Sequence, residues 1–115
     1  MSKGLSYAYS GTTGHITQIA STLPNNPHDL LNNGWEDITH PGAKNSGHLE
    51  LQEKTTGLKI RFDKGDPNGN GFAQKDHYHI LNPNAKSNKD LYLDKDGNPV
   101  RKGSKKSHIL PNGGN

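Results

Sequence analysis

The sequence predicts an α+β domain in which short N-terminal helices pack on an antiparallel sheet of four or five strands. Apolar residues in the first third of the chain have helical spacing, whereas those in the middle alternate with polar residues as in strands. Turn-forming Asn, Gly and Pro separate the alternating segments. This clean alternation argues against a disordered chain, and 115 residues provide for one domain.

The composition limits the classes of protein and site. Only 27% of the residues are hydrophobic, and 14 glycines and 7 prolines indicate a small core with long polar connections. The chain has no cysteine, which excludes disulfides and thiolate metal sites. A formal charge of +3 gives a mild bias towards nucleic acids. No apolar run approaches the roughly 18 residues of a membrane span, and no signal peptide opens the chain, so secretion would require a larger protein.

The N-terminal third is expected to be a helical or linker segment, residues 1–33. Ile16, Ile19, Ala20 and Leu23 share one helical face, and the proline that follows would end that helix. A further helical turn is expected at 29–31. The sheet domain then comprises residues 34–115.

Two alternating segments in the middle of the chain predict a β-hairpin. Residues 48–52 place Leu49 and Leu51 on one face, and residues 58–63 place Leu58, Ile60 and Phe62 on one face. A turn-like Lys-Thr-Thr-Gly stretch joins them.

Further strands are expected after the hairpin. Residues 76–80 place Tyr78 and Ile80 towards the core, and Asn82-Pro83-Asn84 ends that strand. Residues 91–93, the stretch resuming at Val100 and residues 107–110 complete the predicted sheet.

The polar face of these strands carries a set of residues suited to phosphodiester cleavage. Histidine can act as base or acid near neutral pH, and the arginine fork can bind a phosphate. We assign catalytic roles by this chemistry and by strand parity to His77, His79, Arg61 and His108. We assign substrate binding to Asp63, Lys106, Ser107, His48 and Arg101. One of His77 and His79 would be the base, with the other histidine or His108 as the acid.

Other interpretations of the same residues compete with this one. Asp66-Pro67-Asn68-Gly69-Asn70-Gly71 begins like a calcium loop, but the twelfth position, where a bidentate Glu is needed, is His77. A zinc site could use His77 and His79 with His48 or His108 as a third ligand. The histidines could also simply decorate a solvent face, although the pair beside an arginine favours a function.

Four segments resemble the C-terminal nuclease toxin domains of bacterial polymorphic toxins of the contact-dependent growth-inhibition type. They are Gly34–Thr39, Thr56–Asp63, Asp76–Pro83 and Gly103–Ile109, and the similarity spans residues 34–111. Many nucleases of this kind have a barnase-like or EndoU/colicin/RelE-like fold, with N-terminal helices on an antiparallel sheet.

The resemblance implies a ribonuclease that acts on tRNA or other cellular RNA and is neutralised by a cognate immunity protein. It also implies secretion or cell-surface delivery as part of a larger toxin, with action in the cytoplasm of the target cell. We expect cleavage to a 2′,3′-cyclic phosphate without a cofactor or metal. A metal-dependent DNase that uses the His-x-His pair, or a non-enzymatic basic module that binds RNA or protein, are the alternatives.

Overall fold

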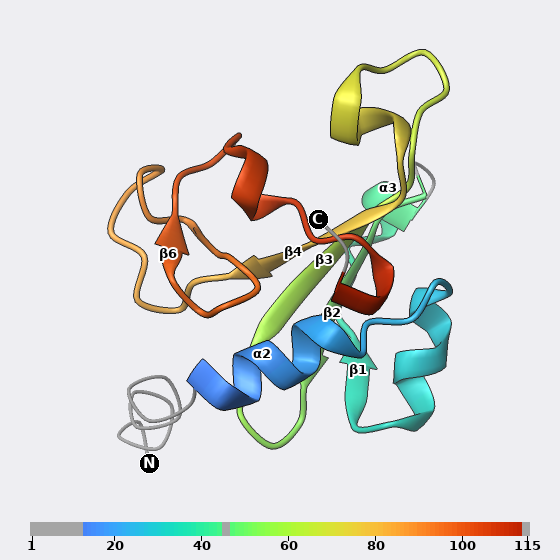
Figure 1. Ribbon diagram of the computed structural model, residues 1–115. Helices are drawn as coiled ribbons and strands as arrows, with labels where there is room; N and C mark the ends of the chain where they lie inside the picture. The colour runs from blue at the N-terminus through green and yellow to red at the C-terminus, as the bar shows by residue number, and fades with distance from the viewer. Residues whose placement is uncertain (1–12, 45–46, 114–115) are drawn as a thin grey trace.

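The computed structural model describes residues 13–44 and 47–113, and it has an α+β fold as predicted (Figure 1). One antiparallel sheet contains six strands in sequential order, against the four or five expected. The strands are β1 (Trp35–Asp37), β2 (Leu49–Glu53), β3 (Lys59–Asp63), β4 (His77–Leu81), β5 (Tyr92–Leu93) and β6 (Pro99–Val100). The helices are α2 (Thr13–Ser21) and α3 (Pro41–Lys44), with 3-10 turns η1 (Pro27–Asn32), η2 (Gly71–Gln74), η3 (Lys105–Ser107) and η4 (Pro111–Gly113).

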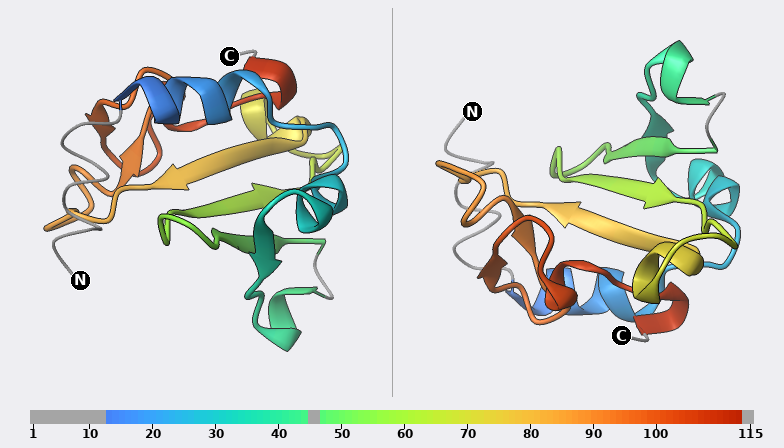
Figure 2. Two further views of the ribbon diagram at one scale, coloured as in Figure 1. Left: turned by 90° about the horizontal axis from the view of Figure 1, so that it is seen from below. Right: turned by 90° about the horizontal axis from the view of Figure 1, so that it is seen from above.

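Helix α2 covers one face of the sheet, and η4 lies beside it (Figure 2). The helical spacing seen in the sequence explains the packing, because Ile16, Ile19, Ala20 and Leu23 are all buried in the common hydrophobic core. The further turn expected at 29–31 is the longer 3-10 helix η1, where the Asn26 side chain accepts a hydrogen bond from a backbone N–H.

The central strands align their apolar residues in two rows across the sheet. Leu51 pairs with Ile60, which pairs with Ile80. The second row runs from Leu49 through Phe62 to Tyr78, and Ile109 extends it through an isolated bridge to Tyr78. Each of these residues is at most 9% exposed, so the core face predicted from alternation is confirmed.

Two parts of the sheet differ from the expectation. Strand β1 was not predicted, because only three residues pair with β2 and only Trp35 of these is buried. The strand expected at 107–110 is shortened to the bridge between Ile109 and Tyr78, because η3 ends at Ser107 and η4 begins at Pro111.

The loop between β3 and β4 is closed at its neck by backbone contacts. The Asp76 carboxylate accepts a hydrogen bond from the Gly65 N–H at 2.7 Å, and a Cβ at Gly65 would lie 2.4 Å from the Gln74 carbonyl oxygen. Inside the loop, the Asp66 carboxylate accepts from the Asn68 N–H. That contact is an Asx turn.

Within residues 13–44 and 47–113, none of the helices has both the length and the apolar character needed to cross a membrane.

Candidate active site

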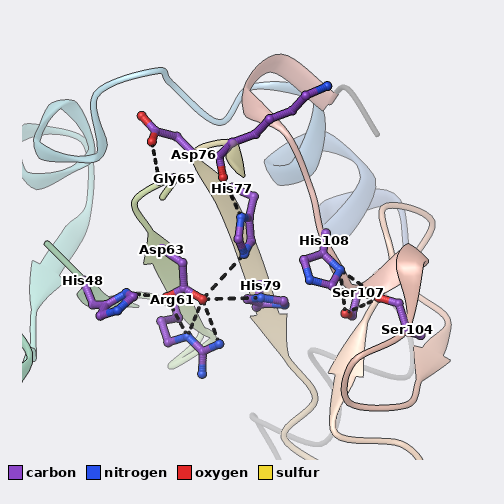
Figure 3. Close-up of polar contacts among 11 residues, drawn as sticks. His48, Arg61, Asp63, Gly65, Asp76, His77, His79, Ser104, Ser107 and His108 are labelled. Atoms are coloured by element: carbon purple, nitrogen blue, oxygen red, sulfur yellow. Dashed lines mark hydrogen bonds and ion pairs between the residues drawn. The ribbon is translucent and has the colours of Figure 1, made fainter. Parts of the chain in front are cut away.

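The strand register brings the predicted histidines and arginine together on the face opposite the core. Arg61 pairs with His79, and Asp63 pairs with His77. The bridge between Tyr78 and Ile109 is antiparallel, so His108 lies beside His79 on the same face. His108 therefore lies against His77 and His79, on the same face as Arg61 (Figure 3).

These side chains line a cavity of about 660 Å³. The walls come from β3, β4 and β5, the start of the β3–β4 loop, and the segment that leads into η3. Six of the residues predicted from the sequence line it: His48, Arg61, Asp63, His77, His79 and His108.

The Asp63 carboxylate lies at the centre of this group. It accepts hydrogen bonds from Nε and Nη2 of Arg61 at 3.0 and 2.9 Å. Its Oδ2 atom lies 3.6 Å from Nε2 of His77 and 3.5 Å from Nε2 of His79. Nδ1 of His48 is 2.8 Å from Oδ1, an ion-pair distance without hydrogen-bond alignment. Asp63 was predicted to bind substrate, but these contacts show that it also orients the surrounding cationic and aromatic groups.

Opposing effects set the charge of Asp63. Burial disfavours its charged form, but the contacts with His77 and Arg61 outweigh burial and hold the pKa of the carboxyl well below its usual range. Asp63 is therefore an anion at neutral pH.

The two histidines of β4 differ in electrostatic environment. Burial lowers the pKa of His77, but the interactions with Asp63 and with the Lys75 carbonyl outweigh burial and raise it. Burial, followed by the positive charge of Arg61, lowers the pKa of His79 to about 3. His77 thus favours the imidazolium form more than a free histidine does, whereas His79 is a neutral ring. They are only 6% and 4% exposed.

His108 completes the cluster from the other side of the cavity. Its Nδ1 lies 2.8 Å from the Ser104 carbonyl oxygen, which fixes the proton of the neutral ring on Nδ1 and places the lone pair on Nε2. The ring stacks on Phe72 at a centroid distance of 5.1 Å and lies 4.9 Å from His77. One ring nitrogen each of His77, His79 and His108 falls within 4.8 Å of the others, so these three could hold a metal ion.

Three predicted residues are placed elsewhere. Ser107 is completely buried, and its hydroxyl donates to the Ser104 carbonyl at 2.7 Å. The same carbonyl accepts from Nδ1 of His108, so Ser107 helps to fix the group that orients His108. Lys106 and Arg101 are exposed and are not among the residues that line the cavity.

The prediction from the sequence missed the other residues that line the cavity, among them Tyr92, Lys64 and Lys102. Tyr92 stacks on His79 with ring centroids 4.5 Å apart, and the Cζ of Arg61 lies 5.7 Å from the Tyr92 ring centroid. The alternation Leu-Tyr-Leu could have revealed it, since a tyrosine between two leucines faces the other side of the strand. Lys64 and Lys102 also line the cavity, and no local pattern distinguishes them from other surface lysines.

No protein-family model, curated protein or solved structure matches this chain.

Proposed function

We propose that this protein is a metal-independent endoribonuclease of the bacterial toxin type, with the histidine cavity as its active site. The observation that carries the proposal is the meeting of three imidazoles with the Arg61 guanidinium in one cavity. Cleavage of RNA by its own 2′-hydroxyl needs a base, an acid and a cation near the phosphate. The cavity supplies each of these from side chains of the chain itself.

The general acid is His77. Its Nδ1–H donates to the Lys75 carbonyl at 2.8 Å, and the Asp63 carboxylate faces its Nε2. This anion favours a proton on Nε2, which is the atom on the cavity side. The acid gives that proton to the 5′-oxygen as the P–O5′ bond breaks.

The general base is His108, in place of the His77 or His79 expected from the sequence. The hydrogen bond of Nδ1–H to the Ser104 carbonyl leaves the lone pair of the neutral ring on Nε2. This nitrogen takes the proton of the 2′-hydroxyl as the 2′-oxygen attacks phosphorus. The products are a 2′,3′-cyclic phosphate and a 5′-hydroxyl. His79 is stacked on Tyr92, and it positions the reacting phosphate between the acid His77 and the base His108.

Arg61 binds the scissile phosphate. Its pair with Asp63 uses Nε and one Nη2 hydrogen, so the rest of its donor fork is outside that pair. The side chain is 36% exposed, which gives a phosphate access to it. Lys64 and Lys102 add positive charge at the same cavity and would attract the flanking phosphates of a polynucleotide.

The resemblance to polymorphic toxins supports the biological setting. The substrate would be tRNA or another cellular RNA in the cytoplasm of a competitor cell, reached by delivery as part of a larger secreted or surface toxin. A cognate immunity protein would cover the cavity. Because Arg61, Lys64 and Lys102 outnumber Asp63 and Asp66 in its lining, we expect that partner to be acidic at the contact.

The test is cleavage of a short RNA by the purified protein in excess EDTA, with product ends identified by mass spectrometry. We expect a cyclic phosphate, and no cleavage when the nucleotide before the scissile bond is 2′-deoxy. His77→Gln should be inactive, and His28→Gln, which changes an exposed histidine, should retain activity. RNA left intact in EDTA would overturn the proposal, and metal-dependent nicking of plasmid DNA would support the DNase alternative.

A further inference from the structure

The three histidines of the cavity have a geometry that suits a transition-metal ion. His77 and His79 project from one face of β4, two residues apart, and His108 lies opposite them on the neighbouring segment. One ring nitrogen of each lies within 4.8 Å of the other two. Nitrogens bound tetrahedrally to Zn²⁺ at about 2.0–2.1 Å are about 3.4 Å apart, so the longest separation must shrink by about 1.4 Å. Binding would therefore draw the three rings together.

The Nδ1 hydrogen bonds of His77 and His108 are of the kind that metal-binding histidines make. Histidines that bind metals usually donate their other ring N–H to a backbone carbonyl or a carboxylate. His77 does so to the Lys75 carbonyl at 2.8 Å, and His108 does so to the Ser104 carbonyl at 2.8 Å. Both contacts keep a proton on Nδ1, so in the neutral ring the lone pair is on Nε2; His77 must first release the Nε2 proton that Asp63 favours.

The third ring has a buried nitrogen to satisfy. Nδ1 of His79 is buried and has no hydrogen-bond partner within the part of the chain that the structure describes. Its ring is 4% exposed and neutral, which is the form that binds a metal. Stacking on Tyr92 and edge contacts with His77 hold the ring in place.

The charge around the cluster permits a cation. The Arg61 guanidinium opposes a second positive charge and acts on His79 more strongly than Asp63 does, although Asp63 pairs with it. The Asp63 Oδ2 atom is 3.5–3.6 Å from Nε2 of His77 and His79, so it can offset the charge of an ion bound beside them. Zn²⁺ suits this nitrogen-rich set, whereas Mg²⁺ requires oxygen ligands.

We propose that His77, His79 and His108 bind one Zn²⁺ ion per chain and that this ion inhibits the nuclease. Binding rests on the geometry alone, and inhibition rests on the proposed function. Coordination uses the lone pair of His108 that would accept the 2′-hydroxyl proton and occupies the Nε2 atom of His77 that would deliver the second proton. The cavity then binds either a metal or a reacting phosphodiester.

Metal titration of the full chain tests the binding. Co²⁺ should give the intense visible bands of tetrahedral nitrogen coordination at one equivalent, and Zn²⁺ should displace it. His108→Gln should weaken Co²⁺ binding at least tenfold, and His28→Gln should bind like the unchanged protein. Because His77 and His79 are buried and their variants could misfold, ¹⁵N NMR of the unchanged protein gives a second measurement. Zn²⁺ should shift Nε2 of His77 and His108 while their Nδ1 atoms stay protonated.

The outcomes separate the two proposals. Absence of tetrahedral Co²⁺ bands together with unshifted imidazole nitrogens overturns the metal site, whatever the RNase assay shows. Cleavage in EDTA that stoichiometric Zn²⁺ abolishes and Mg²⁺ leaves unchanged supports both. If the bands form but Zn²⁺ is needed for cleavage, inhibition is overturned, the binding site stands, and the metal-independent mechanism fails.

Discussion

Asp63 holds Arg61 in a two-point contact, with Nε 3.0 Å from Oδ1 and Nη2 2.9 Å from Oδ2. The two residues are next-but-one neighbours on β3, so both side chains rise from the same face of the strand. This arrangement fixes the plane of the guanidinium, and under the proposed function it does so before the RNA binds. Preorganised donors of this kind stabilise a transition state without reorganisation.

Asp63→Asn should lower kcat/KM for RNA cleavage by roughly 10²-fold, because Arg61 and His77 both lose the anion that orients them. A plot of kcat/KM against pH should be bell-shaped, and its alkaline limb reports the loss of the proton from the acid His77. In the variant this limb should move to lower pH, because the anion no longer favours the proton on His77. Steady-state kinetics across the pH range measure both effects. Asp96→Asn, at an exposed turn, should leave rate and profile unchanged. An unaltered profile in Asp63→Asn would contradict the orienting role.

Arg61→Lys should reduce kcat by about 10²–10³-fold, because lysine keeps the charge but cannot form the planar fork. KM should change less than kcat, since the fork acts on charge that develops in the transition state. Single-turnover kinetics with saturating enzyme separate the two effects. The matched change Lys59→Arg alters an exposed cation on the same strand and should have little effect. A variant that changed only KM would make Arg61 a plain binding residue.

Gly65→Ala should destabilise the fold by about 1–3 kcal/mol, because overpacking forces the backbone to move. The new Cβ would lie 2.4 Å from the Gln74 carbonyl oxygen at the neck of the β3–β4 loop. Urea unfolding provides the measurement. Gly14→Ala on helix α2, where a Cβ would meet no heavy atom of the described residues within 4 Å, should be neutral or stabilising by up to about 1 kcal/mol. Equal effects of the two changes would mean that the neck is not close-packed.

Tyr78→Phe should reduce the amount by which the free energy of unfolding falls at alkaline pH. Burial, followed by the nearby charges of Asp29 and Asp76, raises the pKa of Tyr78 above its ordinary value of 10.0. As the pH rises through 10, the unfolded chain loses this proton first, so the free energy of unfolding falls. In the variant the fall should be shallower. At pH 7 the variant should be less stable by about 1 kcal/mol, because it loses the hydrogen bond from the tyrosine hydroxyl to the Pro24 carbonyl at 2.7 Å.

Denaturant titrations of both proteins between neutral and strongly alkaline pH check this prediction. Parallel curves for the two proteins above pH 10 would mean that Tyr78 ionises equally in both states.

Alternation along the chain was sufficient to predict the two faces of the sheet. Within each strand the buried residues are two positions apart, as Ile60 and Phe62 are on β3, and this period can be read from the local sequence alone. The polar face followed by the same logic, which is why Arg61 and His79 were placed on one side of the sheet from sequence.

The pairing of distant segments and the residues that cover the polar face could not be predicted from the local sequence. The sequence gives no sign that Ile109 bridges Tyr78, and this long-range contact decides that His108 reaches the cavity. His77 and His79 were expected on an open polar face, yet they are nearly inaccessible because Tyr92 and the segment after β6 cover them. Lysines 64 and 102 reach the cavity through loop shape, which residue type alone does not specify.

The bridge between Tyr78 and Ile109 has a consequence for the order in which the protein is made. The strands that carry Arg61, His77 and His79 precede it, so they can pair while the chain is still being synthesised. His108 reaches its place only after residues 105–113 have left the ribosome and docked on β4. Until this segment has docked, the strands of the site lack the residue proposed as the base, so under the proposed function the chain would be inactive before this step.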